Sequence, residues 1–521
     1  MLQNRGSYDI LIDRFKWDVP DRLNMAVQTC DRLAETDPDR VAIICLAKGR
    51  REITYGELRD MSDRIAFALV ASGVSYGDRV GVLRSQDAWC AAAHIAIWKT
   101  GAVSVPLFKL FRYRALAVRL SDSKVGIVIA DADGESMLDD LENVQTLLPE
   151  SLEAGNEGFE TADTASDDPA VLIYTSGTTG SPKGALHAHR VLTGHLPGVE
   201  ISHDFLGRDG DCLWTPADWA WIGGLFDVLM PGLALGVPVV AARMPEFKPE
   251  TCIDIIREGN ARNVFFPPTA LRMLKASGTE IKGLRSVASG GEPLGAEMLE
   301  WGKNAFGLAI NEFYGQTECN MVASSCGALF APRPNCIGRP VPGHEIAVLN
   351  DDGGFSEGEG DVAIRRGSAS MMLEYLNRPE ETAEKFRGEW MLTGDRGVWE
   401  EGYLRFIGRA DDVITSSGYR IGPAEIEDCL MQHPSVANVG VVGKPDELRT
   451  EIVKAYVVLK TGFEGDDRLA VELREFVKSR LAAHCQPRQI GFLDELPMTV
   501  TGKVIRKELK KLAIKEQGRC Q

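Results

Sequence analysis

The sequence lacks an excess of positive charge. Its 521 residues include 58 lysines and arginines against 75 aspartates and glutamates, which gives a net charge of −17. Broad nucleic-acid binding requires a basic surface, so this balance argues against it. Any anionic substrate must therefore be held by local basic groups and oriented backbone N–H groups, against an unfavourable overall field.

Long hydrophobic runs and patterned cysteines are also missing. The most apolar region, residues 229–242, is interrupted by two prolines and two glycines, so we expect no membrane span. The first residues lack the apolar core of a signal peptide, and we see no internal repeat. The eleven cysteines contain no C-x-x-C pair, which predicts neither a zinc site nor a disulfide framework. We therefore expect a protein of the reducing cytoplasm.

What is present is a stretch rich in glycine and hydroxyl groups, residues 174–184, directly after an apolar run. It contains three glycines, five Ser/Thr hydroxyls and one lysine, a combination that suits a loop around a polyphosphate. It is not a Walker A loop, because Pro182 precedes Lys183 and Gly184 follows it. A flexible linker is the alternative, but the strand-like run before the stretch favours a loop inside a folded domain.

This stretch resembles the phosphate-binding loop of the adenylate-forming enzymes, the superfamily of acyl-CoA synthetases, peptide-synthetase adenylation domains and luciferases. The resemblance covers nearly the whole chain, and it is greatest to the medium-chain acyl-CoA synthetase branch. It implies that the loop binds the phosphates of ATP through Thr175, Ser176, Gly177, Thr178, Thr179 and Lys183.

Alternating strand and helix patterns predict a layered α/β fold. Thr54 and Glu57 form a capping-box pattern that predicts the start of a helix, and another helix is expected over residues 91–100. The resemblance implies that residues 1–410 form a large N-terminal adenylation domain. Its expected strands include residues 41–45, 80–83 and 125–131.

The remaining residues, 411–521, are expected to form a small, mobile α+β domain that turns about a hinge at Asp411. Strands are expected over residues 436–443 and 451–459, and a helix over 468–484. About a hundred residues is a common size for such a domain.

Further motifs supply groups suited to a nucleotide. An aromatic face suits a flat base, and a carboxylate can accept the two hydroxyls of a ribose. Glu318 offers a hard oxygen that suits Mg²⁺ bound with ATP, although a solvated helix cap is the alternative. The contacts implied by the resemblance are Gly291, Glu292 and Pro293 beside adenine, Tyr314 against its face, Thr317 at the α-phosphate, Asp395 and Arg409 at the ribose, and Arg420 at a phosphate.

Two tryptophans and one glycine concern the expected acyl pocket. Trp219 and Trp221 flank a single alanine, and the resemblance implies that Trp221, with Trp219 beside it, contacts the substrate's hydrocarbon; core aromatics are the alternative. Gly315 stands where acetate-specific relatives carry a tryptophan that blocks the pocket. Several added methylenes would each contribute about 0.8 kcal/mol when buried, so we predict a short-to-medium-chain or small aryl acid in preference to acetate.

The C-terminal domain carries the expected catalytic residue. Gly502 gives Lys503 a flexible mount, and a mobile lysine can bridge a carboxylate and a phosphate; an exposed lysine of a basic tail is the alternative. The same pattern resembles a site of lysine acetylation, so a lysine acetylase acting on Lys503 is an expected partner. Gly418 is expected to let the pantetheine arm of CoA pass, whereas Thr415 departs from the asparagine or lysine of many relatives.

We therefore predict an AMP-forming acyl-CoA synthetase, with Mg²⁺ as cofactor and a carboxylic acid, ATP and CoA as substrates. The alternatives are an aryl-CoA ligase, an adenylation enzyme with a non-CoA acceptor, a luciferase-like oxygenase and a non-catalytic nucleotide sensor. No Ser-bearing carrier segment follows Lys503, and Lys503, Asp395 and Glu318 argue against the sensor. The sequence leaves open whether the chain forms a homo-oligomer.

Overall fold

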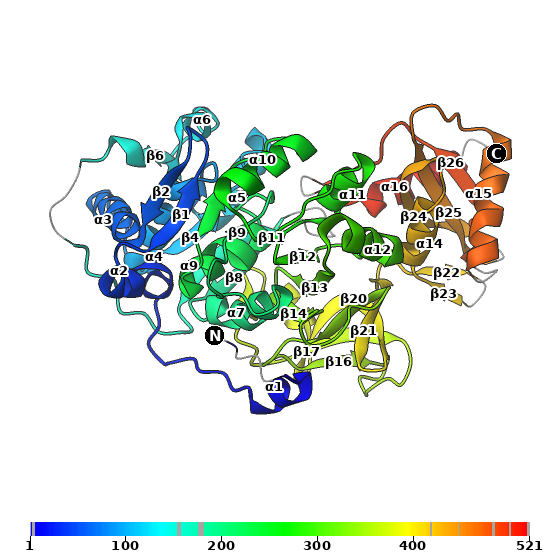
Figure 1. The fold of residues 1–521 in the computed structure, drawn as a ribbon, viewed down its shortest axis with the longest axis horizontal. Helices are drawn as coiled ribbons and strands as arrows, with labels where there is room; N and C mark the ends of the chain where they lie inside the picture. The colour runs from blue at the N-terminus through cyan, green and yellow to red at the C-terminus, as the bar shows by residue number, and fades with distance from the viewer. Residues whose placement is uncertain are drawn as a thin grey trace.

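A large N-terminal body and a smaller C-terminal body lie side by side in the computed structural model (Figure 1). The structure describes residues 2, 6–153, 158–175, 182–416, 419–446, 449–481, 485–499 and 502–517. Three sheets form the framework of this described part of the chain, two in the large body and one in the small body.

The largest sheet positions most of the cleft described below. Its order is β16-β17-β20-β21-β15-β14-β13-β12-β11-β9-β10-β1-β2, with β19 beside β20. Strands β1 and β9 to β13 pair in parallel, so their carboxyl ends share one edge, where α/β sheets usually bind ligands. The strands are β1 Val41–Cys45, β2 Arg51–Thr54, β9 Leu213–Trp214, β10 Val239–Ala241, β11 Asn263–Phe265, β12 Ser286–Gly290, β13 Ile310–Gln316, β14 Cys319–Ser324, β15 Cys336–Pro340, β16 Ile346–Leu349, β17 Gly360–Arg365, β19 Phe386–Arg387, β20 Trp390–Glu400 and β21 Tyr403–Arg409.

A second sheet, in the order β18-β8-β7-β4-β3-β5-β6, shares a core with the first. Apolar residues of β3 and β7 pack with residues of β1, β9 and β10 and with helices α3, α4 and α9 in one buried cluster. Its strands are β3 Arg79–Leu83, β4 Val103–Pro106, β5 Ile127–Ala130, β6 Gln145–Leu147, β7 Pro169–Thr175, β8 Lys183–Ala188 and β18 Glu374–Tyr375.

Helices cover both sheets of the large body. The α-helices are α1 Tyr8–Arg14, α2 Arg32–Thr36, α3 Tyr55–Ala71, α4 Ala88–Lys99, α5 Tyr113–Ser123, α6 Ala132–Ser136, α7 Val191–Ser202, α8 Ile222–Gly224, α9 Met230–Leu235, α10 Pro249–Gly259, α11 Pro268–Ala276, α12 Gly295–Phe306 and α13 Pro379–Glu384; η1 Val27–Asp31 and η3 Leu225–Leu229 are π-helical, and η2 Pro149–Ser151 is a 3₁₀ turn. None of the described helices combines the length and apolar composition needed to cross a membrane.

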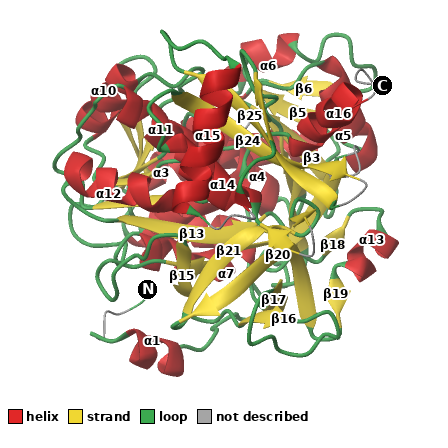
Figure 2. Ribbon diagram, turned by 90° about the vertical axis from the view of Figure 1, so that its right-hand side faces the viewer, coloured by secondary structure: helices red, strands yellow, loops and turns green. Residues whose placement is uncertain are grey.

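The small body is a sheet with helices on both faces. Helices α14 and α15 pack on one face of β24 and β25, and α16 packs on the other (Figure 2). The elements are β22 Ile414–Ser416, β23 Tyr419–Ile421, α14 Pro423–Met431, β24 Val436–Asp446, β25 Thr450–Leu459, α15 Asp467–Arg480, β26 Gln489–Phe492 and α16 Arg506–Gln517.

Local sequence signals explain several helix boundaries. The predicted capping box is confirmed: the Glu57 N–H donates to Thr54 Oγ1 at 3.2 Å, and the Thr54 N–H donates to the Glu57 carboxylate at 2.9 Å. The helix predicted over 91–100 begins earlier, at Ala88, because Asp87 accepts from the Cys90 N–H at 2.7 Å. The helix predicted over 468–484 is α15, which ends at Arg480.

Candidate active site

A cleft of about 1300 Å³ extends from the large body to the small one. Residues of both bodies line it, and these include most of those that the sequence singles out. The predicted residues on its wall are Thr175, Lys183, Trp221, Gly291, Glu292, Pro293, Tyr314, Gly315, Thr317, Glu318, Asp395, Arg409, Asp411 and Lys503.

Sheet topology explains why distant motifs meet here. Gly291 follows directly after β12, and Tyr314 lies near the carboxyl end of the parallel neighbour β13. Asp395 and Arg409 are cross-strand partners on β20 and β21. Asp411 lies between β21, in the largest sheet, and β22, in the small body. The cleft therefore lies where these strands end and where the chain crosses from the large body to the small one.

One end of the cleft is built around Asp395, which is buried. The Tyr314 hydroxyl donates a hydrogen bond to Asp395 Oδ2, and the Arg409 guanidinium lies 3.3 Å from Asp395 Oδ1. Burial raises the pKa of Asp395, while Arg409 and Tyr314 act in the opposite direction. This cluster presents a tyrosine ring, a carboxylate and a guanidinium together, which suits a nucleoside.

A second carboxylate, Glu318, lies on the same wall. The Tyr375 hydroxyl donates to Glu318 Oε1, and Lys183 Nζ lies 5.4 Å from the centre of the Tyr375 ring. Among the described residues, no three or more His, Cys, Asp or Glu side chains are grouped so that they could hold a metal ion by themselves. A single hard oxygen fits a Mg²⁺ ion that is held mainly by nucleotide phosphates and water.

Lys503 enters the cleft from the small body. An ideal Cβ placed on Gly291 would lie 3.8 Å from Lys503 Cε and 3.6 Å from the Trp221 ring, so all three residues meet. Burial lowers the pKa of Lys503, while Glu292 and Asp395 oppose this change. Thr499 orients the turn, because its hydroxyl accepts from the Lys503 N–H at 3.0 Å.

The wall residues that the sequence argument did not single out include Tyr375, Lys385, Asp227 and Asn320. Lys385 Nζ donates to Gln316 Oε1 at 2.9 Å and to the Leu392 carbonyl at 3.2 Å. Burial lowers the pKa of Lys385. No motif marked these positions; an aspartate within the apolar run that forms η3 was the one available signal for Asp227.

The expectation for Trp219 is corrected by its placement. Its side chain is 1% exposed, belongs to the core shared by the two sheets of the large body, and does not line the cleft. Trp221, two residues later, is half-buried and does line it. The two side chains diverge because a turn lies between them: the Trp221 N–H donates to the Asp218 carbonyl at 3.1 Å, whereas side chains two residues apart in extended backbone would share a face.

The steric argument for Gly315 also needs correction. A Cβ added there would lie 2.2 Å from Asn320 Oδ1 and 2.6 Å from the Met321 nitrogen. The missing side chain therefore makes room for β14 and Asn320, and the open space expected for a longer acyl chain is not found in this direction.

Several predicted contacts lie outside the described residues: Ser176, Gly177, Thr178, Thr179 and Gly418. The backbone of Arg420 belongs to β23, and its side chain is likewise outside the description. Thr175 and Lys183, which stand on either side of the undescribed stretch, are cross-strand partners on β7 and β8.

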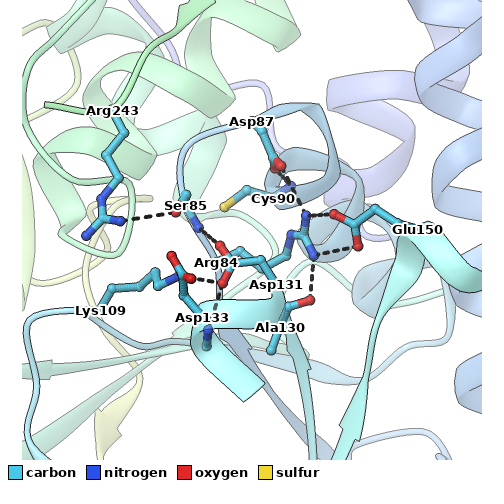
Figure 3. A network of polar contacts seen from close by, with 11 residues as sticks. Arg84, Ser85, Asp87, Cys90, Lys109, Ala130, Asp131, Asp133, Glu150 and Arg243 are labelled. Atoms are coloured by element: carbon cyan, nitrogen blue, oxygen red, sulfur yellow. Dashed lines mark hydrogen bonds and ion pairs between the residues drawn. The ribbon is translucent and has the colours of Figure 1, made fainter. Parts of the chain in front are cut away.

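A second cavity, of about 250 Å³, adjoins Trp221, which lines both cavities. Arg243 lines it and donates to Ser85 Oγ at 3.3 Å (Figure 3). Asp131 accepts from the Ser85 N–H at 2.9 Å, while Arg84 donates to the Glu150 carboxylate at 2.5 Å. Because Arg84 follows β3, Asp131 follows β5 and Arg243 follows β10, this network connects the two sheets of the large body.

The two-body fold and a cleft that gathers lysines, an arginine, carboxylates and an aromatic face define a nucleotide-binding enzyme of the adenylate-forming class. Residues 30–376 match the model of the "AMP-binding enzyme" family, and residues 425–503 match its C-terminal domain. The chain belongs to this family, and within it to the acyl-CoA synthetases.

Known proteins match along nearly the whole chain. It is 34% identical to an acetyl-coenzyme A synthetase of Bacillus subtilis (strain 168), over 94% of this chain and 90% of that protein. It is 33% identical to the mitochondrial acyl-coenzyme A synthetase ACSM4 of Rattus norvegicus, over 96% and 92%. The crystal structure of the anthranilate CoA ligase AuaEII with anthranoyl-AMP superimposes with a TM-score of 0.87 at 26% identity, covering 96% of this chain and 99% of that one.

Proposed function

We propose that this acyl-CoA synthetase converts a carboxylic acid, ATP and CoA into acyl-CoA, AMP and pyrophosphate through an acyl-adenylate. The observation that carries the proposal is the position of Lys503, which the small body places in the same cleft as Asp395, Arg409 and Glu318. The negative formal charge of the whole chain makes such a local set of cations necessary.

In the first step, a carboxylate oxygen attacks the α-phosphorus of ATP and pyrophosphate leaves. Lys503 would neutralise the carboxylate and the phosphate as they approach, and Lys183 lies at the end of the phosphate loop, where β8 begins. Asp395 accepts from the ribose hydroxyls, with Arg409 beside it. Mg²⁺ bound with ATP supplies further charge neutralisation, and Glu318 is the residue that would hold it.

In the second step, the CoA thiol opens the mixed anhydride and AMP leaves. Residues 1–410 and 411–521 serve as the two moving parts, and rotation at Asp411 withdraws Lys503 and brings Gly418 to the thiol. Asp411 is suited to a hinge because its side chain is exposed and it lies between the sheets of the two bodies.

The substrate is a short-to-medium-chain or small aryl acid. Support comes from the apolar part of the cleft wall, which includes Trp221, Ile222, Phe313 and Ile337. The similar anthranilate ligase acts on an aryl acid by its title, which keeps an aryl substrate as the second candidate. A cytoplasmic location and acetylation of Lys503 belong to the same proposal.

The test is pyrophosphate release with acetate to octanoate and benzoate, with and without CoA. We expect a CoA-stimulated signal, an acyl-CoA product and one substrate optimum beyond acetate. Pyrophosphate release without any acyl-CoA would contradict the proposed acceptor, and an optimum at acetate would contradict the proposed chain length.

A further inference from the structure

Asp227 is a buried carboxylate on the cleft wall that has no role in the proposed reaction. Asp227 lies in the π-helical segment η3, is 3% exposed, and lines the same cleft as Trp221 and Lys503. π-Helical turns inside helices are uncommon and frequently occur at functional sites. Trp221 and Ile222, at the start of the same helical run, supply apolar wall to this part of the cleft.

Only one of its oxygens has a protein donor in the described part of the chain. Asn320 Nδ2 donates to Asp227 Oδ1 at 2.7 Å, and no other described residue forms a hydrogen bond or ion pair with this carboxylate. Burial raises the pKa of Asp227 and the Asn320 amide acts in the opposite direction, so a further donor from a ligand would act together with this amide to favour the ionised carboxylate. A buried carboxyl group without a second partner is costly to the folded state, so a purely structural role explains it poorly.

The surroundings of Asn320 show that the pair is built into the wall. Asn320 lies on β14 and is 4% exposed, so its amide is held between Asp227 and the β13–β14 hairpin. Its Oδ1 occupies the space that a side chain at residue 315 would need, 2.2 Å from the ideal Cβ position. The absence of a side chain at Gly315 therefore leaves room for the Asn320 side chain, and Asn320 in turn orients Asp227 through its hydrogen bond.

This part of the cleft has an apolar wall with one hydrogen-bond acceptor, the second oxygen of Asp227, that has no donor among the described residues. A plain hydrocarbon chain bound there would cover Asp227 without replacing its missing partner, which costs free energy. A hydroxyl or amino group on the substrate acid would donate a hydrogen bond to the second carboxylate oxygen of Asp227. Sites built to bond such a group discriminate strongly against analogues that lack it.

We propose that Asp227 is a specificity residue that selects carboxylic acids carrying an N–H or O–H donor on their acyl part, with Asn320 as its positioning residue. This inference rests on the proposed adenylation reaction. It narrows the substrate from any short-to-medium-chain or aryl acid to its hydroxy- or amino-substituted members.

The experiment measures kcat/KM for pyrophosphate release with matched pairs of acids. Butyrate, hexanoate and benzoate are each compared with hydroxy and amino derivatives, with the substituent moved stepwise along the chain or ring. We expect at least one derivative to exceed its parent by about 10²-fold. A hydroxy or an aminobenzoate optimum identifies a neutral donor, because an aniline nitrogen is uncharged at neutral pH, and an amino optimum in the aliphatic series identifies a cation.

Variants connect the preference to the residue. Asp227→Leu should bring the derivative-to-parent ratio to about one or below by lowering the derivative's kcat/KM, because the leucine removes the acceptor. Asp227→Asn keeps shape and an acceptor, so it should abolish preference for an amino derivative more than for a hydroxy derivative. Glu312→Gln is the matched control, since Glu312 is another buried acid on the cleft wall, and it should leave the ratio unchanged.

The outcomes separate the two proposals. If wild type uses parent acids as well as, or better than, every derivative, the role of Asp227 is overturned while adenylation stands. A preference that survives Asp227→Leu in a folded enzyme also overturns it. If no acid in the panel releases pyrophosphate, the proposed reaction fails and the inference fails with it.

Discussion

The two ends of the cleft treat their buried charges differently. At the nucleoside end, Asp395 has both a guanidinium and a hydroxyl partner, and Arg409 has Asp395 and Asp411 within 3.6 Å. At the acyl end, Asp227 has one amide partner and no cation among the described residues. A buried carboxylate with a cationic partner is already organised for its ligand. A buried carboxylate without one requires a hydrogen-bond donor from the ligand.

This difference separates shared chemistry from selectivity. In our proposal, the nucleoside end uses residues that the family resemblance marks, because every member of the class must bind the same nucleotide. The proposed acyl end uses Asp227 and Asn320, which no motif marks, because each member binds its own acid. Mutations at the two ends should therefore change different kinetic constants.

The largest expected effect is at Lys503, which serves both ends. Lys503→Ala should lower adenylation on the order of 10²–10³-fold or more, because one charge-stabilising donor is lost from the transition state. The measurement is acid-dependent exchange of pyrophosphate into ATP. Thioester formation from a presynthesised acyl-adenylate should be much less affected.

Lys511→Ala is the matched control, since Lys511 is exposed on α16 and pairs with Glu508 at 2.7 Å. It should leave adenylation near the wild-type rate. An Lys503→Ala enzyme that forms adenylate at near the normal rate would refute the catalytic role.

The next largest effect is expected for the substitution of Asp395, and it should change the use of ATP without changing the preference among acids. Asp395→Ala should lower kcat/KM for ATP about 10- to 100-fold, corresponding to the ~1.5–3 kcal/mol of hydrogen bonds to a charged group. Steady-state kinetics with ATP and acid varied separately will show whether the preference among acids stays unchanged. Tyr314→Phe, which keeps the ring and removes the hydroxyl on Asp395, should have a smaller effect.

If Asp395→Ala altered the order of preferred acids as strongly as it altered ATP use, the two ends would not be independent. The comparison drawn above would then be wrong.

The smallest expected effect is at Gly315, where two explanations compete. Gly315→Ala forces a Cβ to within 2.2 Å of Asn320 Oδ1, so we expect a loss of about 1–3 kcal/mol in stability from overpacking and displacement of Asn320. Thermal unfolding measures the first effect, and the derivative-to-parent ratio of acids measures the second.

A Gly315→Ala enzyme that keeps that ratio but accepts only shorter acids would support the original steric role of Gly315. It would show that the residue limits chain length, and that seating Asn320 is secondary.

Much of the fold could be predicted because its signals are local. The capping box at Thr54 and Glu57 depends on groups three residues apart, so it is visible in the sequence and appears in the structure. Strand β1 has the bounds that its apolar run predicted. Helix α4 begins at Ala88, three residues before the predicted start, because Asp87 caps it.

In the candidate site, too, some residues could be predicted from local motifs and others could not. Motif order identified Tyr314, Asp395, Arg409 and Lys503 as members of one site, and the structure places all four on one cleft. Trp219 and Trp221 could not be separated, since which of two nearby tryptophans faces the core depends on the backbone before α8.

By itself, the sequence determined the class of enzyme and predicted which residues to propose for its nucleotide site, because glycine turns, hydroxyls and charged motifs carry their chemistry in short stretches. Only the tertiary structure decided what Gly315 does and where Asp227 points. Asp227 and Asn320 are 93 residues apart, and their contact exists because η3 packs against the β13–β14 hairpin. A contact between side chains on separate elements is set by packing, which no local pattern of residues encodes.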